Sequence, residues 1–153
     1  MVLAPQCPTN STWIAELDRV EALVQQWRAD DRVDPRRVYL TGLSMGGFGS
    51  WALAARQPDW FAAVVPICGG GDPTSAPLLV DVPIWAVHGD ADSTVPVEES
   101  QTMVREIQRA GRRPRYSELK GGDHDSWTPT YRADNETIAW MYRQQNDRCQ
   151  DCN

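Results

Sequence analysis

No part of the chain approaches the roughly 18 consecutive apolar residues that a membrane-spanning helix requires. Runs of Lys or Arg are also missing, and the net charge is −6, so neither nucleic acid nor an anionic membrane surface is an expected partner. The first eight residues lack the charged and apolar regions of a signal peptide. These absences predict a soluble, untargeted protein, either of the cytoplasm or of a compartment that the sequence leaves undetermined.

Cysteine is sparse. Cys7, Cys68, Cys149 and Cys152 are too few and too dispersed for a disulfide framework, so reduced thiols are the expectation. Cys149 and Cys152 have the spacing of a metal or redox pair, but they lie in a polar segment with no second such pair and no nearby histidine. A terminal disulfide or free thiols are therefore expected there in place of zinc, and no metal or cofactor is predicted.

The 153 residues, 41% of them hydrophobic, suit one globular domain with one core. We expect a single catalytic domain at residues 1–146 and a polar tail at residues 147–153. Apolar residues recur at helical spacing at Trp13, Leu17, Val20, Val24 and Trp27, which predicts a helix with one buried face.

Strands and helices alternate along the rest of the chain. Apolar runs predict strands at residues 1–4, 37–40, 62–67 and 83–87, and an alternating run predicts a strand nearer a sheet edge at residues 115–120. Further helices are predicted at residues 51–55, 96–111 and 134–144. This order predicts an α/β fold of about five mainly parallel strands with helices on both faces.

The segment from Gly42 to Gly46 reads Gly-Leu-Ser-Met-Gly, a GxSxG motif. It follows a predicted strand and precedes a predicted helix, as the nucleophile elbow of a serine hydrolase does. On that tight turn, Gly42 and Gly46 are expected to leave room for neighbouring backbone, and Gly47 is expected to add further clearance. Ser44 is then the candidate nucleophile, and the backbone N–H of Met45 is one candidate donor to an oxyanion.

Only two histidines are available as the base. His88 ends a buried strand, where a core histidine with its hydrogen bonds satisfied is expected. His124 lies in a polar, glycine-containing loop between the last strand and the last helix. An imidazole there can reach a serine at the carboxyl edge of the sheet and take up its proton.

A carboxylate must orient that imidazole, and two follow the strand at residues 83–87. Asp92 is preferred because it lies further into the loop, whereas Asp90 is placed to hydrogen-bond the turn. Asp123 and Asp125 flank His124 and are interpreted as solvated loop residues. The chain order serine, aspartate, histidine is that of α/β-hydrolases.

These motifs resemble a known family. Residues 34–51, 65–71, 88–96 and 122–127 are similar to the polyhydroxybutyrate-depolymerase-like and feruloyl-esterase-like branch of the α/β-hydrolase superfamily, which includes predicted peptidases, with dienelactone hydrolases as more distant cousins. The likeness spans about residues 2–143. It implies a triad of Ser44, Asp92 and His124 in a truncated α/β-hydrolase fold.

The resemblance implies a carboxylesterase that cleaves a small-molecule ester. Two alternatives remain open: a peptidase or amide hydrolase, and a non-catalytic fragment that acts as an interaction module. The acyl and alcohol groups cannot be assigned. Trp51, Trp85 and Trp127 lie near the motifs, where aromatic residues are more often core than substrate platform.

One departure from the family concerns the start of the chain. Relatives carry three more strands and an HGxG loop before the segment matching residues 1–4, and that loop supplies the second oxyanion donor. Without them we expect the strand at residues 1–4 to move over and pair with the strand at 37–40. The Gln6 side-chain amide or the Cys7 N–H would then come beside Ser44. We also expect a second chain to cover the open edge, giving a homodimer.

Overall fold

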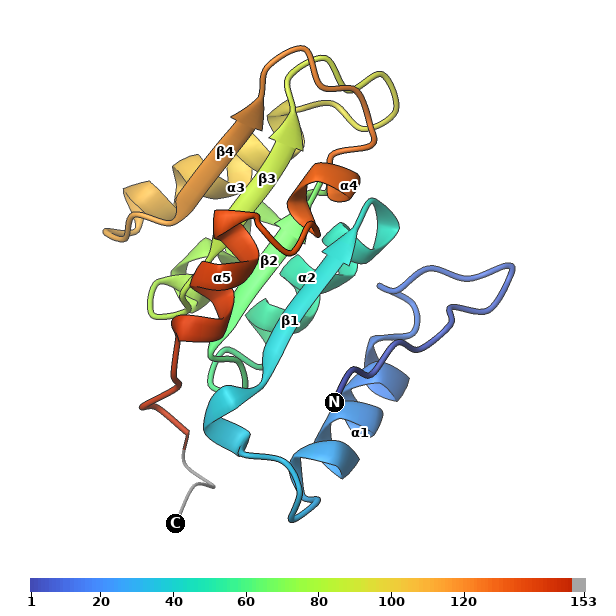
Figure 1. Cartoon of the computed structure of the whole chain (residues 1–153), viewed down its shortest axis with the longest axis vertical. Helices are drawn as coiled ribbons and strands as arrows, with labels where there is room; N and C mark the ends of the chain where they lie inside the picture. Colours follow the sequence, from blue (N-terminus) through green and yellow to red (C-terminus); the bar gives the residue numbers. More distant parts are fainter. Residues whose placement is uncertain (150–153) are drawn as a thin grey trace.

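The computed structural model describes residues 1–149 and contains one parallel sheet (Figure 1). Its four strands lie in the order β1-β2-β3-β4, and each pairs in parallel with its neighbours in that order. The strands are β1 (Tyr39–Leu43), β2 (Ala63–Ile67), β3 (Trp85–Gly89) and β4 (Arg115–Leu119). The parallel α/β architecture predicted from the alternation of strands and helices is confirmed.

The prediction of a fifth strand at residues 1–4 is wrong. These residues form no strand, and Met1 and Val2 are 78% and 87% exposed. Within residues 1–149, β1 pairs only with β2, so the first segment has not moved over to β1 as expected. An apolar run of four residues has too little side-chain area to hold a strand that has no partner beside it. The edge of β1 is left open, and the homodimer that would cover it stays a prediction, which sedimentation can check.

Helices cover both faces of the sheet (Figure 1). One face carries α1 (Leu17–Arg28), α2 (Met45–Arg56) and α3 (Glu98–Arg109), and the other carries α5 (Glu136–Arg143). These four helices correspond to the predicted ones. A short helix, α4 (Trp127–Thr130), and two 3-10 helices, η1 (Pro35–Arg37) and η2 (Pro73–Leu79), were not predicted from the sequence.

The core is divided by the sheet into two apolar clusters. Val64 on β2 faces the cluster under α1, α2 and α3, which contains Leu53 and Ile107. Its neighbour Val65 faces the opposite cluster, where Trp85 and Trp140 meet edge to face with ring centroids 5.5 Å apart. This alternation along one strand is why β2 and β3 read in the sequence as continuous apolar runs.

Parallel strands bring their carboxyl ends to one edge, and the loops that follow the strands gather there (Figure 1). Ser44 follows β1, Cys68 follows β2, Asp92 follows β3 and His124 follows β4. The fold thus collects side chains that are far apart in sequence at one place.

No helix within residues 1–149 is both long and apolar enough to span a bilayer. Cys7 and Cys68 are free thiols, as expected. The prediction for the Cys149 and Cys152 pair lies partly outside the described residues, because the structure describes the chain only to residue 149.

Candidate active site

Ser44 sits on a strained turn between β1 and α2. Its φ of 51° and ψ of −118° are unusual for a residue with a side chain, and its carbonyl accepts hydrogen bonds from the N–H groups of Gly47 and Phe48 at 2.8 and 3.1 Å. The helix therefore begins immediately after Ser44, which places the first N–H groups of α2 beside the serine.

The glycines around Ser44 differ in how tightly they are packed. A Cβ on Gly42 would overlap the carbonyl of Gly46, as expected. A Cβ on Gly46, by contrast, would have Trp13 Nε1 as its nearest neighbour at 3.9 Å, so the expectation that Gly46 must be small is wrong. Gly47 is crowded as well as Gly42, because its Cβ would lie 2.5 Å from the Ile67 carbonyl oxygen.

His124 bridges Ser44 and Asp92. Its Nε2 lies 2.9 Å from Ser44 Oγ, and its Nδ1 lies 2.8 Å from Asp92 Oδ2. The imidazole is 20% exposed, the Asp92 carboxylate is fully buried, and Trp127 meets the His124 ring edge to face at 5.4 Å. The structure thus brings Ser44, His124 and Asp92 into one hydrogen-bonded path.

Asp92 is held as a carboxylate by its surroundings. Burial raises its pKa, but the hydrogen bond with His124 and those from the backbone N–H groups of Val95 and Thr94 outweigh burial, so the net pKa is lowered. The two backbone N–H groups bind Oδ1 at 2.8 and 2.9 Å, which leaves Oδ2 for His124. Asp92 therefore stays ionised and correctly oriented at neutral pH.

The other loop carboxylates have structural contacts. Asp90 accepts a hydrogen bond from the N–H of Gly121 at 2.6 Å, so it ties the turn together as expected. Asp123 is exposed, as expected of a solvated residue. Its carboxylate also accepts hydrogen bonds from the backbone N–H and the hydroxyl of Ser93, so it links two loops, which was not expected. Asp125 accepts a hydrogen bond from the backbone N–H of Thr128 at the start of α4.

His88 is buried in the core, as predicted, and both of its ring nitrogens have partners. Nδ1 lies 2.8 Å from Ser100 Oγ, and Nε2 lies 3.0 Å from the Val95 carbonyl oxygen. Sequence reasoning missed a third contact, in which Nε2 lies 3.2 Å from Asp92 Oδ2. The four-residue spacing across one tight loop is the signal that could have indicated it.

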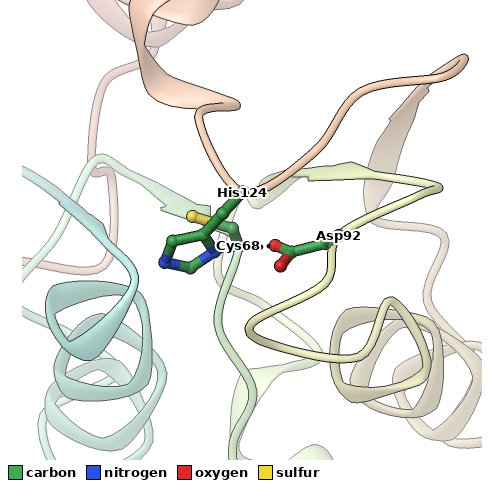
Figure 2. A group of neighbouring side chains, drawn as sticks. All are labelled: Cys68, Asp92 and His124. Carbon is green, nitrogen blue, oxygen red and sulfur yellow. Dashed lines mark hydrogen bonds and ion pairs between the residues drawn. The ribbon is translucent and has the colours of Figure 1, made fainter.

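Cys68 approaches the same site from β2 (Figure 2). Ligand atoms of Cys68, Asp92 and His124 lie within 4.8 Å of one another, so this group has donors for a metal ion. Binding one there would break the hydrogen bonds that join His124 to Asp92 and Ser44. Burial also raises the pKa of the Cys68 thiol to about 11, which opposes thiolate formation. The arrangement suits proton transfer better than metal binding.

A pocket of about 390 Å³ opens beside Ser44. Its lining comprises Thr12, Ile14, Ser44, Met45 and Phe48. Gln6 is exposed in the segment before this lining and is not part of it. Of the three tryptophans near the motifs, Trp51 and Trp85 are core residues, and Trp127 packs on His124.

Comparison with known proteins places the chain among hydrolases. Residues 9–134 match the sequence model described as "Dienelactone hydrolase family". Over 51 residues the chain is 45% identical to "Poly(3-hydroxyalkanoate) depolymerase C" of Paucimonas lemoignei, a match that covers 33% of this chain and 12% of the depolymerase. The chain spans about half or less of the length of the curated relatives it matches.

Solved structures show the same likeness. A thermostable esterase superposes with a TM-score of 0.86 at 37% sequence identity, covering 93% of this chain and 43% of the esterase. The esterase PE8 superposes with a TM-score of 0.64 at 22% identity, covering 88% of this chain and 65% of that one, which shows a shared fold. The expected resemblance to α/β-hydrolase esterases and depolymerases is confirmed.

Proposed function

Because this chain belongs to the dienelactone hydrolase family, we propose that it hydrolyses small-molecule carboxylic esters through an acyl-enzyme formed on Ser44. The observation that carries the proposal is the continuous path from Ser44 Oγ through the His124 ring to Asp92, with distances of 2.9 and 2.8 Å. Such a path activates a hydroxyl that is otherwise a weak nucleophile at neutral pH.

In the first half of the reaction, Ser44 Oγ attacks the ester carbonyl carbon while His124 Nε2 takes the hydroxyl proton. Asp92 holds the Nδ1–H of His124 and balances the charge of the imidazolium. The tetrahedral intermediate collapses when the carbon–oxygen bond to the alcohol breaks and His124 returns the proton to the leaving alcohol. The acyl group remains on Ser44 Oγ.

In the second half, water takes the place of the alcohol. His124 removes a proton from the water as its oxygen attacks the acyl carbon, and the proton then goes to Ser44 Oγ as the acid departs. No cofactor is needed for either half. The His124 ring must be neutral at the start of each half, so activity should fall as the medium becomes acidic enough to protonate it.

The negative charge that develops on the carbonyl oxygen of the substrate must be stabilised by hydrogen-bond donors. The N–H of Met45, the first residue of α2, has no partner within its helix and lies next to Ser44, so it is one proposed donor. The second donor proposed from the sequence is Gln6. The pocket lining offers a second candidate, because Thr12 carries a hydroxyl beside Ser44.

The test of this function is a paired assay. Purified protein and Ser44→Ala are incubated with p-nitrophenyl acetate and, separately, with a fluorophosphonate probe. We expect ester turnover and a probe adduct on Ser44 in the wild type, and neither in the variant. A wild type that takes up no probe and turns over no ester would instead favour a non-catalytic interaction module. Turnover of a p-nitroanilide at a rate similar to the ester would favour an amide hydrolase.

A further inference from the structure

His88 makes more contacts than a core histidine needs. It ends β3 and is fully buried. On one side its Nδ1 lies 2.8 Å from Ser100 Oγ, which in turn lies 2.8 Å from the Gly69 carbonyl oxygen. On the other side its Nε2 faces the Val95 carbonyl oxygen and Asp92 Oδ2 at 3.0 and 3.2 Å.

The two atoms that face Nε2 fix its protonation. A backbone carbonyl and a carboxylate accept hydrogen bonds and donate none, and the Asp92 carboxylate is ionised because its pKa is lowered. A bare Nε2 would place three acceptors against one another in a buried site, which is costly. Nε2 therefore carries a proton, which the Val95 carbonyl and Asp92 Oδ2 share.

The opposite side of the ring is fixed by Ser100 on α3. Its Oγ lies 2.8 Å from His88 Nδ1 and 2.8 Å from the Gly69 carbonyl oxygen, so the His88 ring is held at both nitrogens. Ser100 therefore keeps His88 in the orientation that points Nε2 at Asp92.

We propose that His88 is a positioning residue of the hydrolytic site, whose Nε2–H holds the Asp92 carboxylate in place against His124. Asp92 then accepts four hydrogen bonds, two at Oδ1 from the backbone of Thr94 and Val95 and two at Oδ2 from His88 and His124. All the lone pairs of the carboxylate are used, so it cannot rotate away from His124. This role rests on the proposed ester hydrolysis, whereas the proton on His88 Nε2 can be measured without any activity.

The decisive measurement is long-range ¹H–¹⁵N NMR of histidine-labelled wild-type protein at pH 7. The chain has only two histidines, so the His88→Gln variant assigns both sets of signals. We expect Nε2 of His88 to resonate as protonated. A bare Nε2 would overturn the hydrogen bond to Asp92, whatever the enzyme does, and a wild type without ester turnover would overturn the proposed function while leaving this result intact.

Two variants test the positioning role by kinetics. His88→Gln can keep a donor near the Nε2 position, so kcat should stay within about threefold of wild type. His88→Asn reaches only toward Ser100 and loses the donor to Asp92, so kcat should fall at least about tenfold with KM little changed.

The comparison of the two variants separates positioning from a structural role. A packing defect would lower the melting temperature of both variants and would not restore kcat selectively in His88→Gln. Equal kcat in His88→Gln and His88→Asn would overturn the proposal.

Discussion

Gly47 on α2 and Gly69 after β2 pack backbone against backbone. A Cβ on Gly69 would lie 2.7 Å from the carbonyl carbon of Gly47 and from the backbone nitrogen of Phe48. The first turn of α2 therefore rests directly on the end of β2. This contact sets where the helix begins, and so where Ser44 and the N–H of Met45 lie relative to the loops that carry Asp92 and His124.

This packing makes a prediction about two glycines of the same region. Gly69→Ala should lower the melting temperature and abolish most ester hydrolysis, because no flexible side chain can move to make room. The control is Gly46→Ala, whose Cβ would have ordinary contacts and which lies inside α2, so thermal stability should be unchanged or raised. Thermal unfolding followed by circular dichroism checks both. Equal destabilisation of the two variants would show that the close contact is not what limits the site.

The proposed triad predicts a graded pattern of activity loss. Ser44→Ala and His124→Ala should each abolish p-nitrophenyl acetate turnover without unfolding the protein. Asp92→Asn should lose most activity, because the amide cannot balance an imidazolium and can turn a donor toward His124. Asp90→Asn should lose little, since Asp90 contacts the turn at Gly121 and not His124. A larger loss in Asp90→Asn than in Asp92→Asn would reassign the acid.

The lowered pKa of Asp92 predicts a pH-dependent contribution to stability. A carboxyl whose pKa is lower in the folded state than in the unfolded state stabilises the fold above the unfolded value, near ~3.9, and this contribution disappears as the pH falls through the folded value. The difference in unfolding free energy between wild type and Asp92→Asn should therefore be largest near neutral pH and shrink below about pH 4. Urea unfolding at several pH values measures it, with the exposed Asp81→Asn as control. A constant difference down to pH 2 would contradict the shift.

Cys7 and Cys68, the free cysteines identified within residues 1–149, should react differently. Cys68 is fully buried, and burial raises its pKa to about 11, so it should resist iodoacetamide at pH 8 in the native protein. Cys7 is partly exposed and should be alkylated. Mass spectrometry of tryptic peptides, before and after urea, gives the two extents of modification. Rapid native labelling of Cys68 would mean that the loop after β2 opens on the time scale of the experiment.

The sequence could predict which side chains meet at the candidate site because the chemistry of the proposed triad and the parallel topology restrict each other. Ser44 is marked by its glycines, the base is one of only two histidines, and Asp92 follows a buried strand, so each side chain comes to the same edge of the sheet. The contact between His88 and Asp92 was not predicted, because it depends on the path of a loop and on Ser100 from a distant helix.

The start of the chain was the part that could not be predicted. An apolar run at residues 1–4 forms a strand only if a neighbouring strand offers hydrogen bonds. The prediction assumed that β1 would be that neighbour. The structure leaves these residues unpaired and exposed, while Trp13 packs over Gly49 of α2 and Thr12 reaches the pocket. Of the glycines near Ser44, only Gly46 was wrongly expected to be crowded, since a pattern of glycines does not say which of them meets backbone.

The last prediction concerns the second oxyanion donor, for which Gln6 and Thr12 are rivals. A donor that binds the substrate oxygen mainly in the transition state lowers kcat when it is removed and leaves KM nearly unchanged. Gln6→Ala tests the side-chain amide proposed from the sequence, and Thr12→Val removes the pocket hydroxyl while keeping its shape. Whichever residue is the donor, its variant should lose at least about tenfold in kcat.

Geometry gives the two rivals different requirements. Thr12 already lines the pocket beside Ser44, whereas Gln6 is exposed and would have to move inward when substrate binds. A Gln6→Pro variant restricts the backbone of its segment, so it should reduce kcat further than Gln6→Ala if that movement matters. If Gln6→Ala and Thr12→Val both keep wild-type kcat, neither side chain stabilises the oxyanion, and the Met45 N–H must act with a backbone donor such as the Cys7 N–H, or alone.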